Sequence, residues 1–343
     1  MKLNKFLIAL VLSSPIAGAI ACASCGCSLN TDLSTQGMGS NPGWTFDIRY
    51  DYLNQNQLRS GKSTISPATA LNITNPKNGQ LAEVEGFTKN NYLTSSTDYN
   101  NGETWGVSAV LPFIQREHMT YGVDDGTGTV GWPSGAAGYT SNSRGLGDVK
   151  VIGRYFGFAE QKDWGLQFGL KLPTGKTNQT STNGSSAVDP GLQLGTGSTD
   201  LILGAYKFSR FAFADDWGYY GNIQIQTAVA SKNIPGNLAT LETPGNYRPG
   251  DSLNGSFGIT YHAFENWVPS VQFNVIDKKS DSGAAADTWS TGGTLVYLTP
   301  GLLYSASDVM QIFVNVQLPI YQNLNGIQLA PTSVTSVGVR VHF

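Results

Sequence analysis

Charged residues are scarce in this chain of 343 residues. Asp, Glu, Lys and Arg make up 13% of it, against about 25% in a typical soluble protein. The formal net charge is −3, so the basic excess that nucleic-acid binding requires is missing. No stretch approaches 18 consecutive apolar residues, which excludes a bundle of membrane helices. Hydrophobic residues still reach 40%, too many for a disordered chain.

Glycine and aromatic residues are abundant by contrast. The chain has 41 Gly, 15 Tyr, 15 Phe and 7 Trp, and its mean hydropathy is −0.16. Asn, Gln, Ser, Thr and Gly therefore supply the polarity that charged residues usually provide. This composition leaves an all-β protein, which is either a secreted sandwich or solenoid or a transmembrane β-barrel.

The first residues are typical of an export signal. Lys2 and Lys5 give a positive start before an apolar run from Phe6 to Leu12, and Ala19-Ile20-Ala21 fits the small-residue cleavage pattern. We predict a signal peptide over residues 1–21, a Cys-containing periplasmic segment over 22–43 and a barrel over 44–343. Lipid attachment at Cys22 is an alternative fate for the new N-terminus.

All three cysteines of the chain lie in one short segment, as Cys22, Cys25 and Cys27. In an oxidising compartment they favour one disulfide plus a free or lipidated thiol. The C-x-x-C-x-C spacing also suits a soft metal such as copper or zinc. Both interpretations stay open, and no other cofactor is expected.

Apolar and polar residues alternate in segments of about ten residues, the length of a membrane-spanning β-strand. In the first, Trp44, Phe46 and Ile48 alternate with Asp47 and Arg49. The pattern predicts twelve antiparallel strands in up-and-down order. They cover residues 44–52, 90–99, 105–113, 149–155, 164–172, 199–208, 219–226, 253–261, 271–275, 293–304, 310–318 and 334–343.

The connections between these segments alternate in length. Short ones are expected at 100–103, 157–163, 209–217, 262–267 and 305–308, and long ones at 54–89, 114–146, 174–198, 230–250, 278–292 and 321–333. Bacterial outer-membrane barrels have short periplasmic turns and longer outer loops. We therefore expect a barrel in the outer membrane of a Gram-negative bacterium with both termini in the periplasm. A soluble exported β-protein is the alternative, and it has no reason for this alternation.

The chain ends on an alternating strand that finishes in Phe343. This resembles the C-terminal strand of outer-membrane barrel proteins, whose final aromatic residue serves as the assembly signal. The expected partners are outer-membrane lipid, the barrel-assembly machinery and a small-molecule solute, with no nucleic acid.

Charges on the polar faces of these strands would point into the lumen. Barrel closure makes the first and last strands neighbours, which brings Asp47, Arg49 and Asp51 beside Arg340 and His342. Such charges either brace the wall as ion pairs or form a constriction that selects solutes. No acid–base or nucleophile constellation is visible, so we do not expect an enzyme. The candidate lumen or constriction residues are Asp47, Arg49, Asp51, Asp148, Lys150, Arg154, Lys171, Arg340 and His342.

Three motifs in the middle of the chain carry a family resemblance. They are Gly145-Leu146-Gly147-Asp148, Leu172-Pro173-Thr174-Gly175 and Leu194-Gly195-Thr196-Gly197-Ser198-Thr199-Asp200. Their order resembles the MetA-pathway phenol-degradation family of outer-membrane proteins, also described as a transporter family. The resemblance implies an outer-membrane barrel that passes small and often hydrophobic or aromatic compounds.

The function expected from these observations is a narrow channel for passive uptake of small solutes. The alternative is a structural or metal- or redox-associated outer-membrane protein that uses the periplasmic thiols of Cys22, Cys25 and Cys27.

Overall fold

The computed structural model describes residues 42–343 apart from 78, 80, 123–138, 183–186 and 235–244. Nearly all regular elements are strands. The barrel strands are β1 (Gly43–Gly61), β3 (Val84–Asn100), β4 (Trp105–Gly122), β5 (Tyr139–Leu146), β6 (Val149–Tyr155), β7 (Trp164–Leu172), β8 (Ser198–Phe211), β9 (Ala214–Ser231), β12 (Ser252–Tyr261), β13 (Trp267–Lys278), β14 (Gly293–Ser305) and β15 (Met310–His342). The connections hold β2 (Ser63–Thr64), α1 (Pro67–Ala70), η1 (Pro190–Leu192), β10 (Asn233–Ile234) and β11 (Gly245–Asn246).

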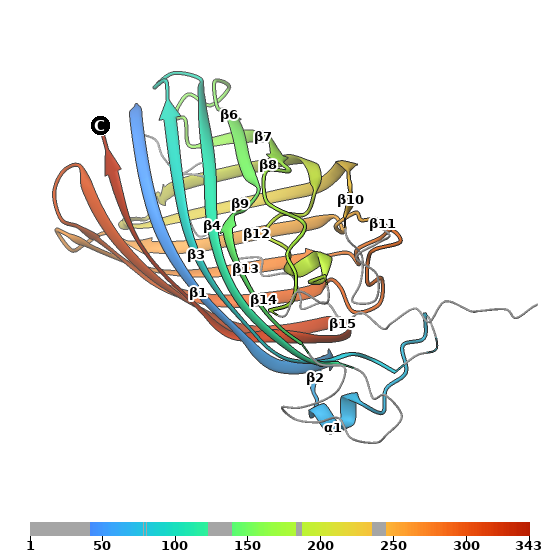
Figure 1. The fold of residues 1–343 in the computed structure, drawn as a ribbon. Coiled ribbons are helices and arrows are strands. Elements are labelled where there is room, and N and C mark those ends of the chain that lie inside the picture. The colour runs from blue at the N-terminus through green and yellow to red at the C-terminus, as the bar shows by residue number, and fades with distance from the viewer. Residues whose placement is uncertain (1–41, 78, 80, 123–138, 183–186, 235–244) are drawn as a thin grey trace, which may run out of the picture.

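The barrel is closed and antiparallel, with strands in chain order around the wall (Figure 1). β1 pairs with β15 over a long ladder that includes Asp47 opposite Arg340, so the first and last strands meet as closure requires. β5 and β6 pair with successive parts of β4 and together make one pass across the wall. The predicted all-β antiparallel barrel is confirmed.

β15 crosses the wall twice. Its part up to Leu324 pairs with β14, and its part from Ile327 pairs with β1. The reversal falls at Asn325-Gly326, where Gly326 has a φ of 57°, and Asn-Gly is a typical hairpin turn. Counted this way, the described chain makes the twelve passes expected from the sequence.

The predicted long loop at 321–333 is wrong, because those residues continue two strands to a tight turn. Strands on this side also extend beyond the predicted limits, with β1 running to Gly61 and β3 beginning at Val84. A wall that rises past the bilayer no longer needs an apolar outer face, so its strands lose the alternation that marks membrane segments. Backbone pairing and a small apolar core continue them.

The two faces of the wall follow the predicted alternation. On β1, Phe46 and Ile48 are exposed on the outer face, whereas Asp47 and Arg49 are buried on the inner face. Aromatic side chains gather at the end where β1 begins and β15 finishes, here called the terminal end. Contacts there include Trp44–Tyr99, Tyr99–Trp105, Phe158–Trp164, Trp217–Tyr261 and Trp267–Tyr304. Such a ring is typical of a membrane interface.

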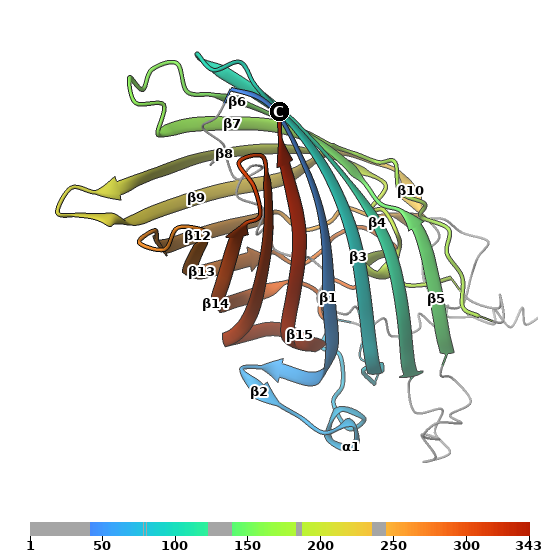
Figure 2. The ribbon, with the colours of Figure 1, turned by 90° about the vertical axis from the view of Figure 1, so that its left-hand side faces the viewer.

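The opposite end, here called the loop end, carries α1 and β2 (Figure 2). A small core there joins Leu58, Tyr121 and Leu329 to the segment around α1. No described helix is both long and apolar enough to cross a bilayer. The predicted signal peptide and Cys22, Cys25 and Cys27 lie outside the described residues.

Candidate functional site in the barrel lumen

The three family-like motifs meet in one buried network. Lys171 Nζ lies 3.1 Å from Oδ2 of Asp148 and 3.1 Å from Oδ2 of Asp200. It also donates to the hydroxyls of Thr196 and Ser198. All three charged side chains are almost completely buried. Residues at most 52 positions apart in the chain thus form a single cluster of one ammonium group and two carboxylates on the inner wall.

Backbone contacts tie the loop between β7 and β8 into this network. Asp148 accepts hydrogen bonds from the Gly175 N–H at 3.0 Å and the Thr196 N–H at 2.9 Å. The two loop strands approach closely, since a Cβ on Gly175 would lie 2.6 Å from the Gly195 Cα. Only glycine allows that approach. The motifs therefore fix the loop against the barrel wall and place Leu194 inside.

A second group of charges lies where β1 meets β15. The Asp47 carboxylate and the Arg340 guanidinium are 3.2 Å apart. Arg49 Nε lies 2.9 Å from Oδ2 of Asp51, and the Ser336 hydroxyl donates to Oδ1 of Asp51 at 2.5 Å. Closure of the barrel thus brings opposite charges together across nearly the whole length of the chain.

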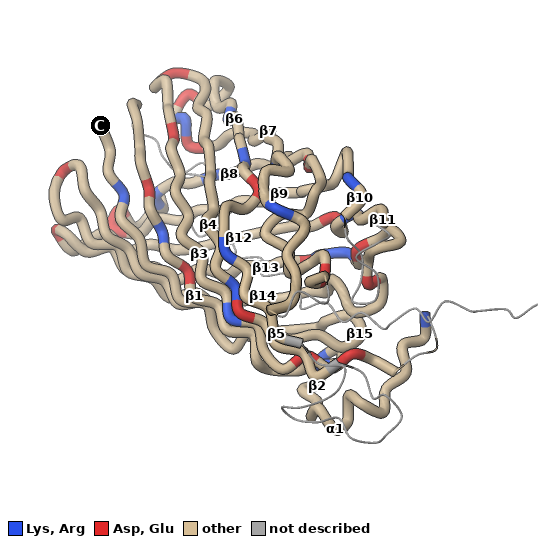
Figure 3. The backbone as a smooth tube through the Cα atoms, viewed as in Figure 1, with Lys and Arg blue, Asp and Glu red and all other residues tan. Residues whose placement is uncertain are grey.

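The remaining lumen candidates also face inward. Arg154 is buried and lies 2.8 Å from Asp98, a partner that the sequence analysis did not name. Lys150 is half-buried opposite Lys171 in the β6–β7 register. His342 Nδ1 lies 3.1 Å from the Thr45 hydroxyl. Figure 3 shows charges of both signs close together along the wall, with long uncharged stretches between them.

Sequence reasoning also missed a buried arginine nearer the loop end. Arg116 was placed in a predicted loop but lies on β4. Its guanidinium donates to the Asn90 side chain at 2.5 Å, the Tyr92 hydroxyl at 3.1 Å and the Gln193 carbonyl at 3.2 Å. The predicted strand over residues 90–99 did place two of these partners, Asn90 and Tyr92, in the barrel wall.

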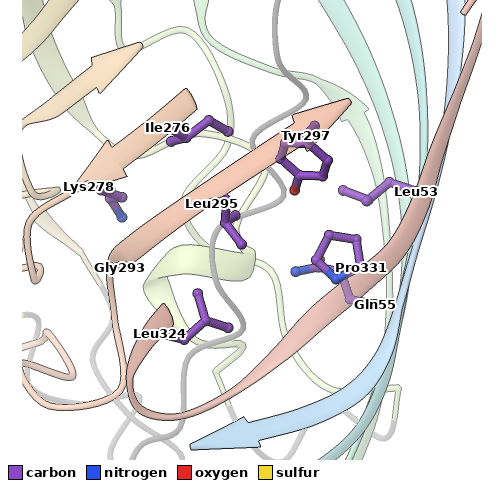
Figure 4. Close-up of a pocket in the computed structure, with 10 residues that line it drawn as sticks. Leu53, Gln55, Ile276, Lys278, Gly293, Leu295, Tyr297, Leu324 and Pro331 are labelled. Atoms are coloured by element: carbon purple, nitrogen blue, oxygen red, sulfur yellow. The ribbon is translucent and has the colours of Figure 1, made fainter. Parts of the chain in front are cut away.

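Between these polar groups and the loop end, the lumen becomes apolar. Ten buried side chains form one cluster, namely Leu53, Tyr92, Ile114, Leu194, Ile276, Leu295, Tyr297, Leu324, Ala330 and Val334. A cavity beside them is lined by Leu53, Leu295 and Tyr297 together with Gln55 and Lys278. Figure 4 shows Leu53, Tyr297 and Pro331 facing one another across this space. An apolar cavity with a few polar groups is the usual form of a small-molecule site.

A buried acidic group lies in the loop between β7 and β8. Asp189 precedes η1, is fully buried, and neither carboxylate oxygen has a hydrogen-bond partner among the described residues. Burial, followed by the nearby charges of Glu83, Glu85 and Asp287, raises the pKa of Asp189 well above its ordinary value. Within the described part of the chain, no group of three or more His, Cys, Asp or Glu side chains is arranged to hold a metal ion.

Comparison with known proteins places the fold. No protein-family profile and no curated protein matches the sequence. Among solved structures, the COG4313 outer membrane channel from Pseudomonas putida F1 aligns over 88% of this chain and 96% of its own, with 11% identity and a TM-score of 0.61. The Ralstonia pickettii toluene transporter TbuX aligns over 94% and 97%, with 12% identity and a TM-score of 0.46. At such identities, the similarity to the COG4313 channel shows a shared outer-membrane barrel fold.

Proposed function

We propose that this chain is a passive channel for small hydrophobic solutes. The observation that carries the proposal is the apolar cavity inside a barrel whose inner wall is otherwise largely polar. Inward-facing positions of a membrane barrel normally meet water and are polar. Leu53, Ile276 and Leu295 depart from that rule together and line one space. The fold shared with an outer-membrane channel supports the same function.

The charged groups closer to the terminal end serve a different purpose in this proposal. Asp51, Arg154 and Lys171 are each at most 4% exposed and each lies in an ion pair. Paired and buried charges favour bracing of the wall over a water-filled constriction. A wide polar pore would leave such groups hydrated. We therefore expect a low ion conductance in planar bilayers.

We also propose the cellular setting. The barrel lies in the outer membrane with both termini in the periplasm, and Phe343 acts as the signal for the assembly machinery. The aromatic ring at the terminal end supports the placement of an interface there. The meeting of all three motifs at Lys171 supports membership of the MetA-pathway phenol-degradation family. No residue is assigned a catalytic role, because the proposed activity is diffusion.

Filling the cavity tests the proposed function. In Leu295→Trp the added ring occupies the apolar space, and we expect binding of p-xylene to the purified barrel to fall by tenfold or more. Leu298→Trp is the matched control. It lies on the same strand and faces outward, because it pairs with the exposed Phe273. Binding is measured by equilibrium dialysis against protein-free detergent micelles. Unchanged binding in Leu295→Trp would show that the cavity is not the solute site.

A further inference from the structure

A shallow groove lies on the outer face of the barrel wall, where β7, β8, β9 and β12 run side by side (Figure 2). Its lining includes Ala205, Lys207 and Ile223. These residues share the outward-facing side of their strands with the exposed Leu203 and Ile225. The groove therefore opens on the surface that faces lipid, apart from the apolar cavity of the lumen.

Two glycines keep this part of the surface low. Gly221 lines the groove, and Gly255 lies opposite Ile223 in the β9–β12 register. A Cβ would meet nothing closer than 3.5 Å on Gly221 or 3.9 Å on Gly255, and neither residue has a positive φ. By contrast, a Cβ on Gly165 would lie 2.7 Å from the Tyr155 carbonyl oxygen. Packing within the chain thus requires glycine at neither groove position. Glycine weakens a strand and often marks a place where a ligand approaches.

A charged pair lies at the terminal end of the groove. Lys207 Nζ is 2.8 Å from Oδ2 of Asp163, and the two side chains are 50% and 15% exposed. Lys207 is opposite Trp164 in the β7–β8 register, and Trp164 belongs to the aromatic ring at that end. Such rings lie at the level of the lipid headgroups. The pair therefore presents one ammonium group and one carboxylate to the headgroups, directly beside an apolar groove.

We propose that this groove binds one phospholipid molecule whose headgroup carries a primary ammonium group, as in phosphatidylethanolamine. An acyl chain lies over Ala205 and Gly221 and packs against Ile223. The lipid phosphate accepts a hydrogen bond from Lys207, and the headgroup ammonium donates to Asp163. The site is independent of the solute proposed for the lumen.

The charge pattern selects among headgroups. Phosphatidylethanolamine supplies a phosphate for the lysine and an N–H donor for the carboxylate. Phosphatidylglycerol has the phosphate but no cation to place beside Asp163. Phosphatidylcholine has a cation, but its fully methylated nitrogen has no N–H to donate. Both should therefore bind more weakly than phosphatidylethanolamine.

Native mass spectrometry of the purified protein in detergent measures this preference. The protein is titrated with the three phospholipids, which carry identical acyl chains. We expect phosphatidylethanolamine to bind about fivefold more tightly than either of the others, the effect of one exposed charged contact. Asp163→Asn should remove the preference, whereas Lys207→Gln should weaken the binding of all three lipids.

Matched variants control for general effects on the wall. Ala205→Leu fills the groove and should weaken the binding of all three lipids about fivefold, the loss of part of one acyl-chain contact. Ala109→Leu makes the same substitution at an exposed, outward-facing position on β4 and should leave binding unchanged. Glu117→Gln removes a carboxylate from the exposed Lys89–Glu117 pair and should leave the lipid preference unchanged. Gly221→Val replaces Ala205→Leu if that variant does not fold.

Three results would overturn the proposal. Equal affinities of the wild-type protein for the three lipids, or a preference that persists in Asp163→Asn, would show that this pair does not read the headgroup. Equal losses in Ala205→Leu and Ala109→Leu would place lipid binding elsewhere on the wall. A dimer without retained lipid that dissociates in Ala205→Leu would assign the groove to a second copy of the chain. A lost preference in Asp163→Asn, with weaker binding in Ala205→Leu and not in Ala109→Leu, supports the proposal.

Discussion

Lys171 is the position at which loss of one charge should most disturb the barrel wall. Its ammonium group contacts Asp148 and Asp200, each at 3.1 Å, and all three side chains are almost completely buried. Lys171→Met keeps an unbranched stem of similar length and removes the charge. Two buried carboxylates then lie close together with no cation between them.

The expected cost follows from this geometry. Removing one partner of a buried ion pair typically destabilises a protein by about 3–5 kcal/mol. Asp148 keeps its two backbone N–H donors, which offsets part of the loss. Asp200 keeps donors from the side chains of Ser198 and Gln226. We therefore expect a loss of about 3 kcal/mol, at the lower end of that range.

The measurement is urea unfolding of the barrel in phospholipid vesicles, followed by tryptophan fluorescence. Lys207→Met provides the matched control, because Lys207 pairs with Asp163 at 2.8 Å but its side chain is half exposed. An exposed pair contributes at most about 1 kcal/mol. Adding Asp200→Asn to Lys171→Met should recover part of the stability, since it removes one of the two carboxylates that Lys171→Met leaves without a cation.

Equal losses in Lys171→Met and Lys207→Met would refute this reasoning. That result would mean that water or relaxation of the wall compensates the buried carboxylates. The three motifs would then share a location without forming a stabilising network.

Three further predictions concern other parts of the molecule. Asp189→Asn should stabilise the protein at pH 7 and have little effect near pH 3. Burial and charges such as Glu83 raise the pKa of Asp189 in the folded state. Ionisation of Asp189 therefore destabilises the folded protein as the pH rises above the unfolded-state pKa of this carboxyl group. Thermal unfolding in detergent at both pH values tests this. Gly338→Val should destabilise the barrel by about 1–3 kcal/mol, because a Cβ there would lie 2.3 Å from the Phe313 ring; urea unfolding with no shift would contradict it. Ile223→Arg places a charge on the outer face, where Ile223 is 51% exposed, and should cost about 2–4 kcal/mol in vesicles; an equal urea midpoint in wild type and variant would show that this position does not face lipid.

Much of the wall could be predicted from the sequence, because a membrane strand meets lipid on one face and the lumen on the other. Side-chain polarity therefore alternates every two residues, and a short segment of sequence is enough to show it. It placed Asp47, Arg154 and Lys171 on the inner face and made β1 and β15 neighbours. The same signal fades beyond the bilayer, which is why the strands around Asn325-Gly326 were predicted as a loop.

The apolar cavity could not be predicted in this way. Inward-facing Leu53 and Tyr297 look like any other strand residues when only alternation is considered. Their meeting depends on register across strands that are far apart in the chain. The partner of Arg154 shows the same limit, since Asp98 lies 56 positions away and is selected by the pairing of β3, β4 and β6.

The sequence by itself thus determined the barrel, the facing of its strands and the closure of its ends, because these follow from a two-residue period and the need to pair every edge. Only the tertiary structure decided which charges meet, how three separate motifs converge on Lys171, and where the lumen becomes apolar. Those contacts depend on the relative register of distant strands, which no local pattern records.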